Sequence, residues 1–234
     1  MSIAQQQFSP IYGVPIVGCD DRFEDRAAVG RRLAEQLQQY RGSRAIVLAL
    51  PPGGVAVAGE VARALRLPLD ALIARGFAVR PYPGVMAGAL SEAGGLCFNA
   101  AVLRLPGVSV STIWHEASQA QHEIIAMVGA YRHDRPLPTL SRRPVILVDD
   151  GLHSGLIQLA ALRALRRLHP QRCIIATPSG TTDALKVVAR HADAVITLKH
   201  LTDAEELRGH GWRLGLGDDD SAILLDRYQR QAAL

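Results

Sequence analysis

The stretch Val145-Ile-Leu-Val-Asp-Asp-Gly-Leu-His-Ser-Gly155 decides how this chain of 234 residues is expected to fold. Its first four residues are apolar and mostly β-branched, which predicts a buried strand. Two adjacent carboxylates, Asp149 and Asp150, follow where that strand ends. A short loop with glycine at both ends, 151–155, then leads into an apolar helical pattern that begins at Leu156. A strand that passes through a short loop into a helix is a typical unit of an α/β sheet.

The same stretch predicts a binding site for a phosphorylated sugar. N–H groups of the loop and of the helix start are donors for a phosphate. The carboxylates of Asp149 and Asp150 can accept hydrogen bonds from hydroxyl groups or bind a metal ion. The simpler alternative is a helix N-cap beside a solvated acid. We prefer the functional interpretation, because two adjacent acids repel each other and need a cation or hydroxyl donors nearby.

A second glycine loop, Pro51-Pro52-Gly53-Gly54, follows another apolar strand, 45–50. Taken alone, it is equally well an ordinary turn. Glycines that open a helix at a strand end also let backbone amides approach an anion closely. The loop is neither a Walker A loop nor a GxGxxG motif. Because both glycine loops follow the carboxyl ends of strands, we expect them to share one crevice.

Strands and helices of crossover length alternate along the chain. This predicts an α/β fold with a doubly wound, mostly parallel sheet flanked by helices. Strands are expected over 45–50, 69–74, 145–148, 172–177 and 194–198, and helices over 22–40, 55–65, 110–132, 156–169 and 182–191. In the first of these helices, an apolar face is formed by Val29, Leu33, Leu37 and Tyr40.

The remaining segments are less regular. Residues 1–20 are expected to form a poorly ordered or peripheral N-terminal arm, and 21–234 a single domain. Within that domain, 75–143 is predicted to be an irregular flap followed by the long helix, with short strands near 87–90 and 96–98. The segment 200–234 is expected to close the chain with a short helix.

Composition excludes several classes of function. The net charge of +4 favours anionic ligands but is too small to indicate nucleic-acid binding. The three cysteines are widely separated and form no CxxC, which argues against a disulfide framework or a zinc site and fits a reducing cytoplasm. The N-terminus lacks the features of a signal peptide. No apolar run approaches membrane-spanning length, so no membrane partner is expected.

The stretch 145–155 resembles the ribose-phosphate-binding signature of type I phosphoribosyltransferases. The resemblance covers roughly residues 20–230. Within the family, the chain is similar to one poorly characterised bacterial subgroup. Its further counterparts are Arg22-Phe-Glu-Asp-Arg26, Leu48-Ala-Leu-Pro-Pro-Gly-Gly-Val55, Leu69 to Arg75 and Gly88-Ala-Leu-Ser-Glu92. The order and spacing of the two glycine loops make the resemblance specific as to fold.

The resemblance implies an α/β core with a flap and hood, which binds phosphoribosyl pyrophosphate with Mg²⁺. It also implies transfer of the 5-phosphoribosyl group to a nitrogenous acceptor, with release of pyrophosphate. By this resemblance, Asp149 and Asp150 bind the ribose hydroxyls, with direct contact to Mg²⁺ as a further option. The 5′-phosphate is bound by Gly151, Leu152, His153, Ser154 and Gly155. The pyrophosphate loop is formed by Pro51, Pro52, Gly53 and Gly54. By the same resemblance, 75–106 is a mobile flap and 210–216 belongs to the hood.

This sequence departs from the family pattern Asp-Asp-Gly-x-Ala-Thr-Gly-x-Thr within the phosphate loop. His153 replaces the small residue, Ser154 replaces the first threonine, and Ile157 replaces the last. Ser154 keeps a hydroxyl group, whereas Ile157 removes one. His153 either donates to a phosphate or projects into solvent.

The other departures concern cations near the leaving pyrophosphate. Pro52 stands where the subgroup has arginine, and Gly76 stands where a lysine follows Arg75. Each charge-assisted contact that is lost is worth about 1.5–3 kcal/mol. We expect Arg75 on the leaving-group side, with Arg80 and His153 as substitute cations.

Three functions are therefore compared. The first is an active phosphoribosyltransferase. The second is a catalytically impaired relative that binds a nucleotide or sugar phosphate in a regulatory role. The third is an assembly role, with Trp114 and the helix 110–132 at an interface such as that of a homodimer.

Overall fold

The structure is a computed structural model, and it describes residues 6–11, 14–18, 25–133, 135–201 and 217–232. Its helices and strands, in chain order, are β1 (Gln6–Ile11), β2 (Val14–Gly18), α1 (Arg26–Gln36), β3 (Ile46–Ala49), α2 (Gly54–Leu65), β4 (Leu69–Ala71), β5 (Ala74–Val79), β6 (Tyr82–Ser91), β7 (Gly95–Phe98), α3 (Val110–Arg132), β8 (Pro144–Val148), α4 (Leu156–Arg167), β9 (Arg172–Thr181), α5 (Thr182–Ala189), β10 (Ala194–Leu201) and α7 (Asp218–Ala232). Short 3-10 turns lie at Gln38–Tyr40, Glu92–Gly94 and Val102–Arg104.

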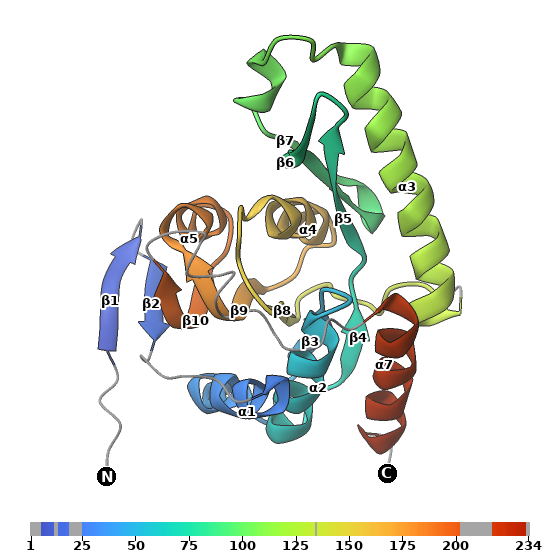
Figure 1. Cartoon of the computed structure of the whole chain (residues 1–234). Coiled ribbons are helices and arrows are strands. Elements are labelled where there is room, and N and C mark those ends of the chain that lie inside the picture. The colour runs from blue at the N-terminus through green and yellow to red at the C-terminus, as the bar shows by residue number, and fades with distance from the viewer. Residues whose placement is uncertain (1–5, 12–13, 19–24, 134, 202–216, 233–234) are drawn as a thin grey trace.

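The main sheet has seven strands in the order β1-β2-β10-β9-β8-β3-β4. Every neighbouring pair is parallel except the hairpin of β1 and β2. The helices cover both faces, with α1 and α2 on one side and α4 and α5 on the other (Figure 1). The predicted doubly wound, mostly parallel sheet is therefore confirmed.

Strand β8 shows why these residues form a central strand. Ile146 and Val148 point into the core layer beneath α1 and α2, whereas Val145 and Leu147 point into the layer beneath α4. All four side chains are buried. A strand that is covered on both faces needs a continuous apolar run, and this one supplies it.

The apolar face predicted for the first helix, Val29, Leu33, Leu37 and Tyr40, is buried. Helix α1 supplies Val29 and Leu33. It begins at Arg26 instead of the predicted start near residue 22, because Asp25 caps it: the Asp25 carboxylate accepts a hydrogen bond from the Ala28 N–H at 2.6 Å. The helix ends at Gln36, and a 3-10 turn carries Tyr40 into the core.

The N-terminal segment was predicted to be an arm, but its described parts belong to the main sheet. Strand β2 pairs in parallel with β10, with Ile16 opposite Val195 and Val17 opposite Ile196. Strand β1 then pairs with β2 at the edge of the sheet (Figure 1). These hydrogen bonds join residues far apart in the sequence, so the local composition of the segment did not predict them.

Within 75–143 the segment expected to be an irregular flap is more regular than its sequence indicates, and the long helix is α3 as predicted. Strands β5, β6 and β7 form an antiparallel sheet of three strands, which stands above the main sheet beside α3 (Figure 1). The expected short strands near 87–90 and 96–98 lie within β6 and β7. The expected strand over 69–74 is divided, because β4 ends at Ala71 and β5 begins at Ala74.

Packing explains why this segment is regular. One face of the small sheet packs on α3 through Phe77, Ala87 and Ile113. The other face packs on α4 through Cys97 and Leu159. The small sheet is therefore packed between two helices.

Strand β9 continues to Thr181, four residues beyond the predicted end at Thr177. Its last residues pair with β10, with Ser179 opposite Lys199 and Thr181 opposite Leu201. Thr181, and not Thr182, caps α5, because its side chain accepts from the Ala184 N–H at 3.3 Å. Pro178 and Gly180 resemble a turn in sequence, but tertiary pairing keeps them in the strand.

The C-terminal helix α7 spans 15 residues and is longer than the short helix that was predicted. It packs on α2, with Leu225 fully buried and the Tyr228 hydroxyl donating to Glu60 at 3.0 Å. The expected hood segment 210–216 lies outside the described residues. No helix in the described part of the chain combines the length and the apolar character needed to span a bilayer.

Candidate functional site

The two glycine loops lie side by side, because β3 and β8 are adjacent parallel strands. The backbone of Gly54 packs so closely on β8 that a Cβ atom there would lie 2.7 Å from the Val148 carbonyl oxygen. At Gly53, a Cβ atom would lie 1.8 Å from Oδ2 of Asp150. The glycines of the turn 51–54 therefore permit close contact with the acidic end of β8.

The loop 151–155, for which the sequence predicts phosphate binding, is held by the extension of β9. The Leu152 N–H donates to the Ser179 carbonyl at 2.9 Å, and the Thr181 N–H donates to the Leu152 carbonyl at 3.1 Å. The Leu152 side chain is fully buried. Leu152 therefore anchors the loop, and its N–H group is already in use.

Three other amides of this loop have no acceptor within the part of the chain that the structure describes. Among the described residues, none accepts a hydrogen bond from the N–H groups of Gly151, Ser154 or Gly155. Gly155 begins α4 with a φ of 73° and has no side chain to cap the helix. The loop and the start of α4 together present unsatisfied donors at the positive end of a helix, which suits an anion.

Ser154 keeps its hydroxyl at this edge. The side chain is exposed, with Oγ 3.4 Å from the Leu156 amide nitrogen and 3.6 Å from Sδ of Met86. Both contacts are long, so the hydroxyl remains available to a ligand. Ile157 is half-buried and packs on the apolar core, which explains how a hydrophobic residue is accepted where the family has threonine.

The two acids face different surroundings. The Asp149 carboxylate accepts hydrogen bonds from the Asp150 N–H at 2.8 Å and from Nε2 of Gln158. Burial, and next the charge of Asp150, raise the pKa of Asp149 to about 8. Gln158 is only 4% exposed, so its amide is committed to this contact. Asp149 is thus the inner acid of the pair.

Asp150 is the outer acid. Its carboxylate rests against the backbone of Gly53 and forms an ion pair with Arg26, with 3.1 Å between Oδ2 and Nη2. The Asp150 side chain is 27% exposed, and that of Arg26 is 14% exposed. Asp150 therefore lies between the two glycine loops with an open side for a ligand.

The loop of Pro51 to Gly54 is a tight turn. The Gly54 N–H donates to the Leu50 carbonyl at 3.0 Å, and the Val55 N–H donates to the Pro52 carbonyl at 3.3 Å. Helix α7 supports the turn from behind, since the Ser221 hydroxyl donates to the same Pro52 carbonyl at 3.0 Å. The turn supplies shape and close backbone approach, but no cationic side chain.

The cations expected beside the leaving group lie elsewhere or are already paired. Arg75 of β5 contacts Asp218 at 2.5 Å and Glu123 at 3.7 Å. Arg80 lies in the turn between β5 and β6, is 84% exposed, and pairs with Glu116 of α3 at 3.7 Å. The structure does not bring Arg80 together with the two glycine loops.

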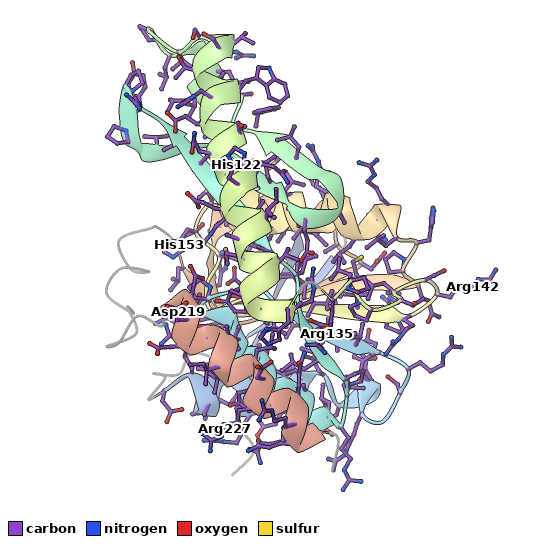
Figure 2. All side chains as sticks on the ribbon, turned by 90° about the vertical axis from the view of Figure 1, so that its right-hand side faces the viewer. His122, Arg135, Arg142, His153, Asp219 and Arg227 are labelled. Atoms are coloured by element: carbon purple, nitrogen blue, oxygen red, sulfur yellow. The ribbon has the colours of Figure 1, made fainter. Side chains whose placement is uncertain are left out.

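His153 projects from the phosphate loop and is exposed. In Figure 2, His153 and Asp219 lie on the left of the view, and Arg142 lies on the right. Its backbone carbonyl accepts from the Thr181 hydroxyl at 3.0 Å, which fixes the loop while leaving the ring at the surface.

Arg26 and Gln158 were not predicted as site residues. Gln158 had a usable signal, because a lone amide sat in an otherwise apolar stripe of α4. Arg26 had a weaker signal, because it lies in the segment 22–26, which resembles the family but implies no role for this residue. Its position at the site depends on β2, which delivers the start of α1 to the carboxyl edge of the sheet.

No group of three or more His, Cys, Asp or Glu side chains suited to a metal ion occurs within the described ranges. Cys97 and Cys173 are buried free thiols, and Cys173 lies in a core strand as predicted. Oxygen donors at the site come from Asp149 and Asp150.

The phosphoribosyl transferase domain family matches residues 21–206, so the chain belongs to this family. It is 33% identical over 214 residues to proteins named "Putative phosphoribosyl transferase" from two strains of Mycobacterium tuberculosis, with 90% of this chain covered. The match covers 48% of those proteins, so the chain spans about half their length.

The crystal structure of the protein TT1426 from Thermus thermophilus has the same fold. It is 31% identical to this chain, with a TM-score of 0.71, and the match covers 89% of this chain and 99% of that one. The family and the parallel sheet together confirm the resemblance to type I phosphoribosyltransferases.

Proposed function

We propose that this chain binds phosphoribosyl pyrophosphate and transfers its 5-phosphoribosyl group to a nitrogenous acceptor. The observation that carries the proposal is that no described residue accepts from the N–H groups of Gly151, Ser154 and Gly155, next to an outer acid that contacts the turn 51–54. Membership of the phosphoribosyl transferase family supports the same ligand.

Each part of the ligand has a matching group. The 5′-phosphate would accept hydrogen bonds from the amides of Gly151, Ser154 and Gly155 and from the Ser154 hydroxyl. The ribose hydroxyls would donate to Asp150, whose carboxylate is partly open, and to Asp149 once the Gln158 contact is shared. The pyrophosphate would lie along the turn 51–54.

The reaction exchanges one bond at the anomeric carbon. The bond to the pyrophosphate oxygen breaks with its electron pair remaining on that oxygen, and the acceptor nitrogen bonds to the carbon and then releases its proton. The carbon passes through an oxocarbenium-like state. The protein must hold the two partners in line and offset the charge that grows on the leaving group.

Magnesium fits this site as a companion of the ligand. Asp149 already accepts from Gln158 and from the Asp150 N–H, so Asp150 is the better protein oxygen donor. Mg²⁺ commonly binds through one or two carboxylates together with substrate phosphates. Bound in that way, it would supply positive charge to the leaving diphosphate.

The second candidate function is ligand binding without turnover. It is favoured by the turn 51–54, which provides no cation for pyrophosphate departure. An assembly role is favoured by exposed apolar side chains on α3, with Trp114 55% and Val110 70% exposed. Ligand binding without turnover predicts affinity for a phosphorylated ribose compound but no release of pyrophosphate. An assembly role predicts self-association of the protein.

Calorimetry and turnover assays separate these candidates. Titration of the protein with ribose 5-phosphate, and with phosphoribosyl pyrophosphate plus Mg²⁺, is expected to show binding of both. Pyrophosphate release should then appear with at least one base in a panel of nitrogenous acceptors. Binding without release would favour the second candidate, and the absence of any binding would refute both ligand-based functions.

A further inference from the structure

We propose that Arg26 supplies the positive charge on the pyrophosphate side of the ligand, in place of the cation that the turn 51–54 lacks. This inference rests on the proposed function, because it concerns the same site. It assigns the leaving-group contact to a residue from the first turn of α1, far from either glycine loop in the sequence.

The position of Arg26 follows from the topology. Strand β2 runs parallel to β10, so the connection from β2 through α1 to β3 is a crossover between parallel strands. In such a connection the helix begins at the carboxyl edge of the sheet, where α2 and α4 also begin. Arg26 is therefore delivered to the edge that carries both glycine loops.

The contacts of Asp150 place Arg26 beside the turn. Nη2 of Arg26 lies 3.1 Å from Oδ2 of Asp150. The same oxygen would lie only 1.8 Å from a Cβ atom on Gly53. A single carboxylate thus separates the guanidinium from the turn. The Arg26 side chain is 14% exposed, so the guanidinium lies inside the site and not on the outer surface.

Other described cations are less suited to this role. The Arg75 guanidinium pairs with both Asp218 and Glu123, and Arg80 is an exposed partner of Glu116. The segments 51–54 and 149–155 contain no lysine or arginine. His153 carries a full charge only when protonated, whereas a guanidinium is charged at every physiological pH.

The chemistry of arginine suits a shared contact. A guanidinium has five N–H donors in a planar fork. Its several donors let one guanidinium contact a carboxylate and a phosphate at the same time, and the fork matches phosphate geometry. Asp150 would hold Arg26 in place before the ligand arrives, and it would bind a ribose hydroxyl through its open side.

Two ligands that differ only by the pyrophosphate group test this role. Calorimetry would compare ribose 5-phosphate with phosphoribosyl pyrophosphate plus Mg²⁺, using wild type and Arg26→Gln. Loss of one charge-assisted contact is expected to weaken phosphoribosyl pyrophosphate binding at least tenfold. Ribose 5-phosphate affinity should stay within about twofold, because that ligand has no group on the leaving side.

The matched control is Arg31→Gln, which removes an arginine of the same helix whose side chain is 53% exposed and pairs with Glu60. It should leave both affinities unchanged. Arg26→Met, which keeps the apolar stem, repeats the test if Arg26→Gln does not fold, as judged by circular dichroism. The expectations for both Arg26 variants are the same.

The outcomes are distinct. Equal weakening of both ligands would show that Arg26 only positions Asp150, and equal retention of both would show no role in binding. Either result overturns this inference and leaves the proposed function standing. A wild-type protein that binds neither ligand overturns the proposed function itself.

Discussion

At the scale of single residues, the adjacent acids Asp149 and Asp150 have different hydrogen-bond and ion-pair partners. Asp149 is enclosed and accepts from Gln158, and Asp150 faces Arg26 and Gly53. Their alternate directions follow from the end of β8, where successive side chains point to opposite faces of the sheet. Two carboxylates that look equivalent in sequence therefore lie in different surroundings, and burial raises the pKa of Asp149.

The raised pKa of Asp149 predicts a pH dependence of stability. Its folded-state pKa of about 8 lies above the ordinary value of about 4, so the folded protein holds a proton that the unfolded chain has released. This contribution to the free energy of unfolding is complete below about pH 4 and is lost as the pH rises through about 8.

Urea unfolding of wild type and Asp149→Asn between pH 4 and pH 9 measures this effect. The variant should match or exceed the stability of wild type at pH 8–9, and its advantage should shrink toward pH 5. A difference between the two proteins that does not change with pH would contradict the assignment of a raised pKa to Asp149.

At the scale of elements, a buried ion pair joins the small sheet to the core. Arg132, at the end of α3, is 2% exposed and pairs with Glu92, which follows β6. The same guanidinium donates to the Ala71 carbonyl of β4 at 2.9 Å. Glu92 also accepts from the Ile73 N–H at 2.7 Å. The junction between the main sheet and the β5–β7 sheet is therefore closed by charge-assisted hydrogen bonds.

Replacement of Glu92 by glutamine should destabilise the protein by about 3–5 kcal/mol, because Arg132 would remain buried without the carboxylate to which it is hydrogen-bonded. Chemical denaturation at pH 7 measures the loss. The control is Glu116→Gln, which removes the partner of the exposed Arg80 and should cost less than about 1 kcal/mol. Equal effects of the two changes would show that the junction is not held by this pair.

At the scale of the whole molecule, the site exists only when distant segments meet. Arg26, the turn 51–54 and the loop 149–155 come from separate parts of the chain and join at one edge of the main sheet. Helix α7 adds a fourth support, through Ser221 to Pro52. The unfolded chain cannot form this arrangement, so the proposed ligand would bind only the folded protein and stabilise it.

A ligand at 100 times its Kd should therefore stabilise the folded protein by about 2.7 kcal/mol. For a domain of this size, that corresponds to a rise in Tm of roughly 5–10 °C. Scanning calorimetry with ribose 5-phosphate measures the shift, and free ribose at the same concentration is the control. A Tm that stays constant with ribose 5-phosphate would exclude binding at the phosphate loop.

Much of the fold followed from local patterns. The run 145–148, the helix α3 and the apolar face of α1 were predicted because each periodicity matches one secondary structure. Only short strands were expected in the small sheet, because its glycines interrupt the alternation that indicates longer strands. Its regularity comes from α3 and α4, which bury both of its faces.

The sequence by itself determined the family, the doubly wound sheet and the two glycine loops, because these depend on residue types in short, contiguous segments. Only the tertiary structure decided which acid is enclosed, that Gln158 and Arg26 face the acids, and that the first residues extend the sheet. Those features depend on contacts between residues such as Arg26 and Asp150, which lie 124 positions apart. Local patterns carry no record of such pairings, since the packing of whole elements creates them.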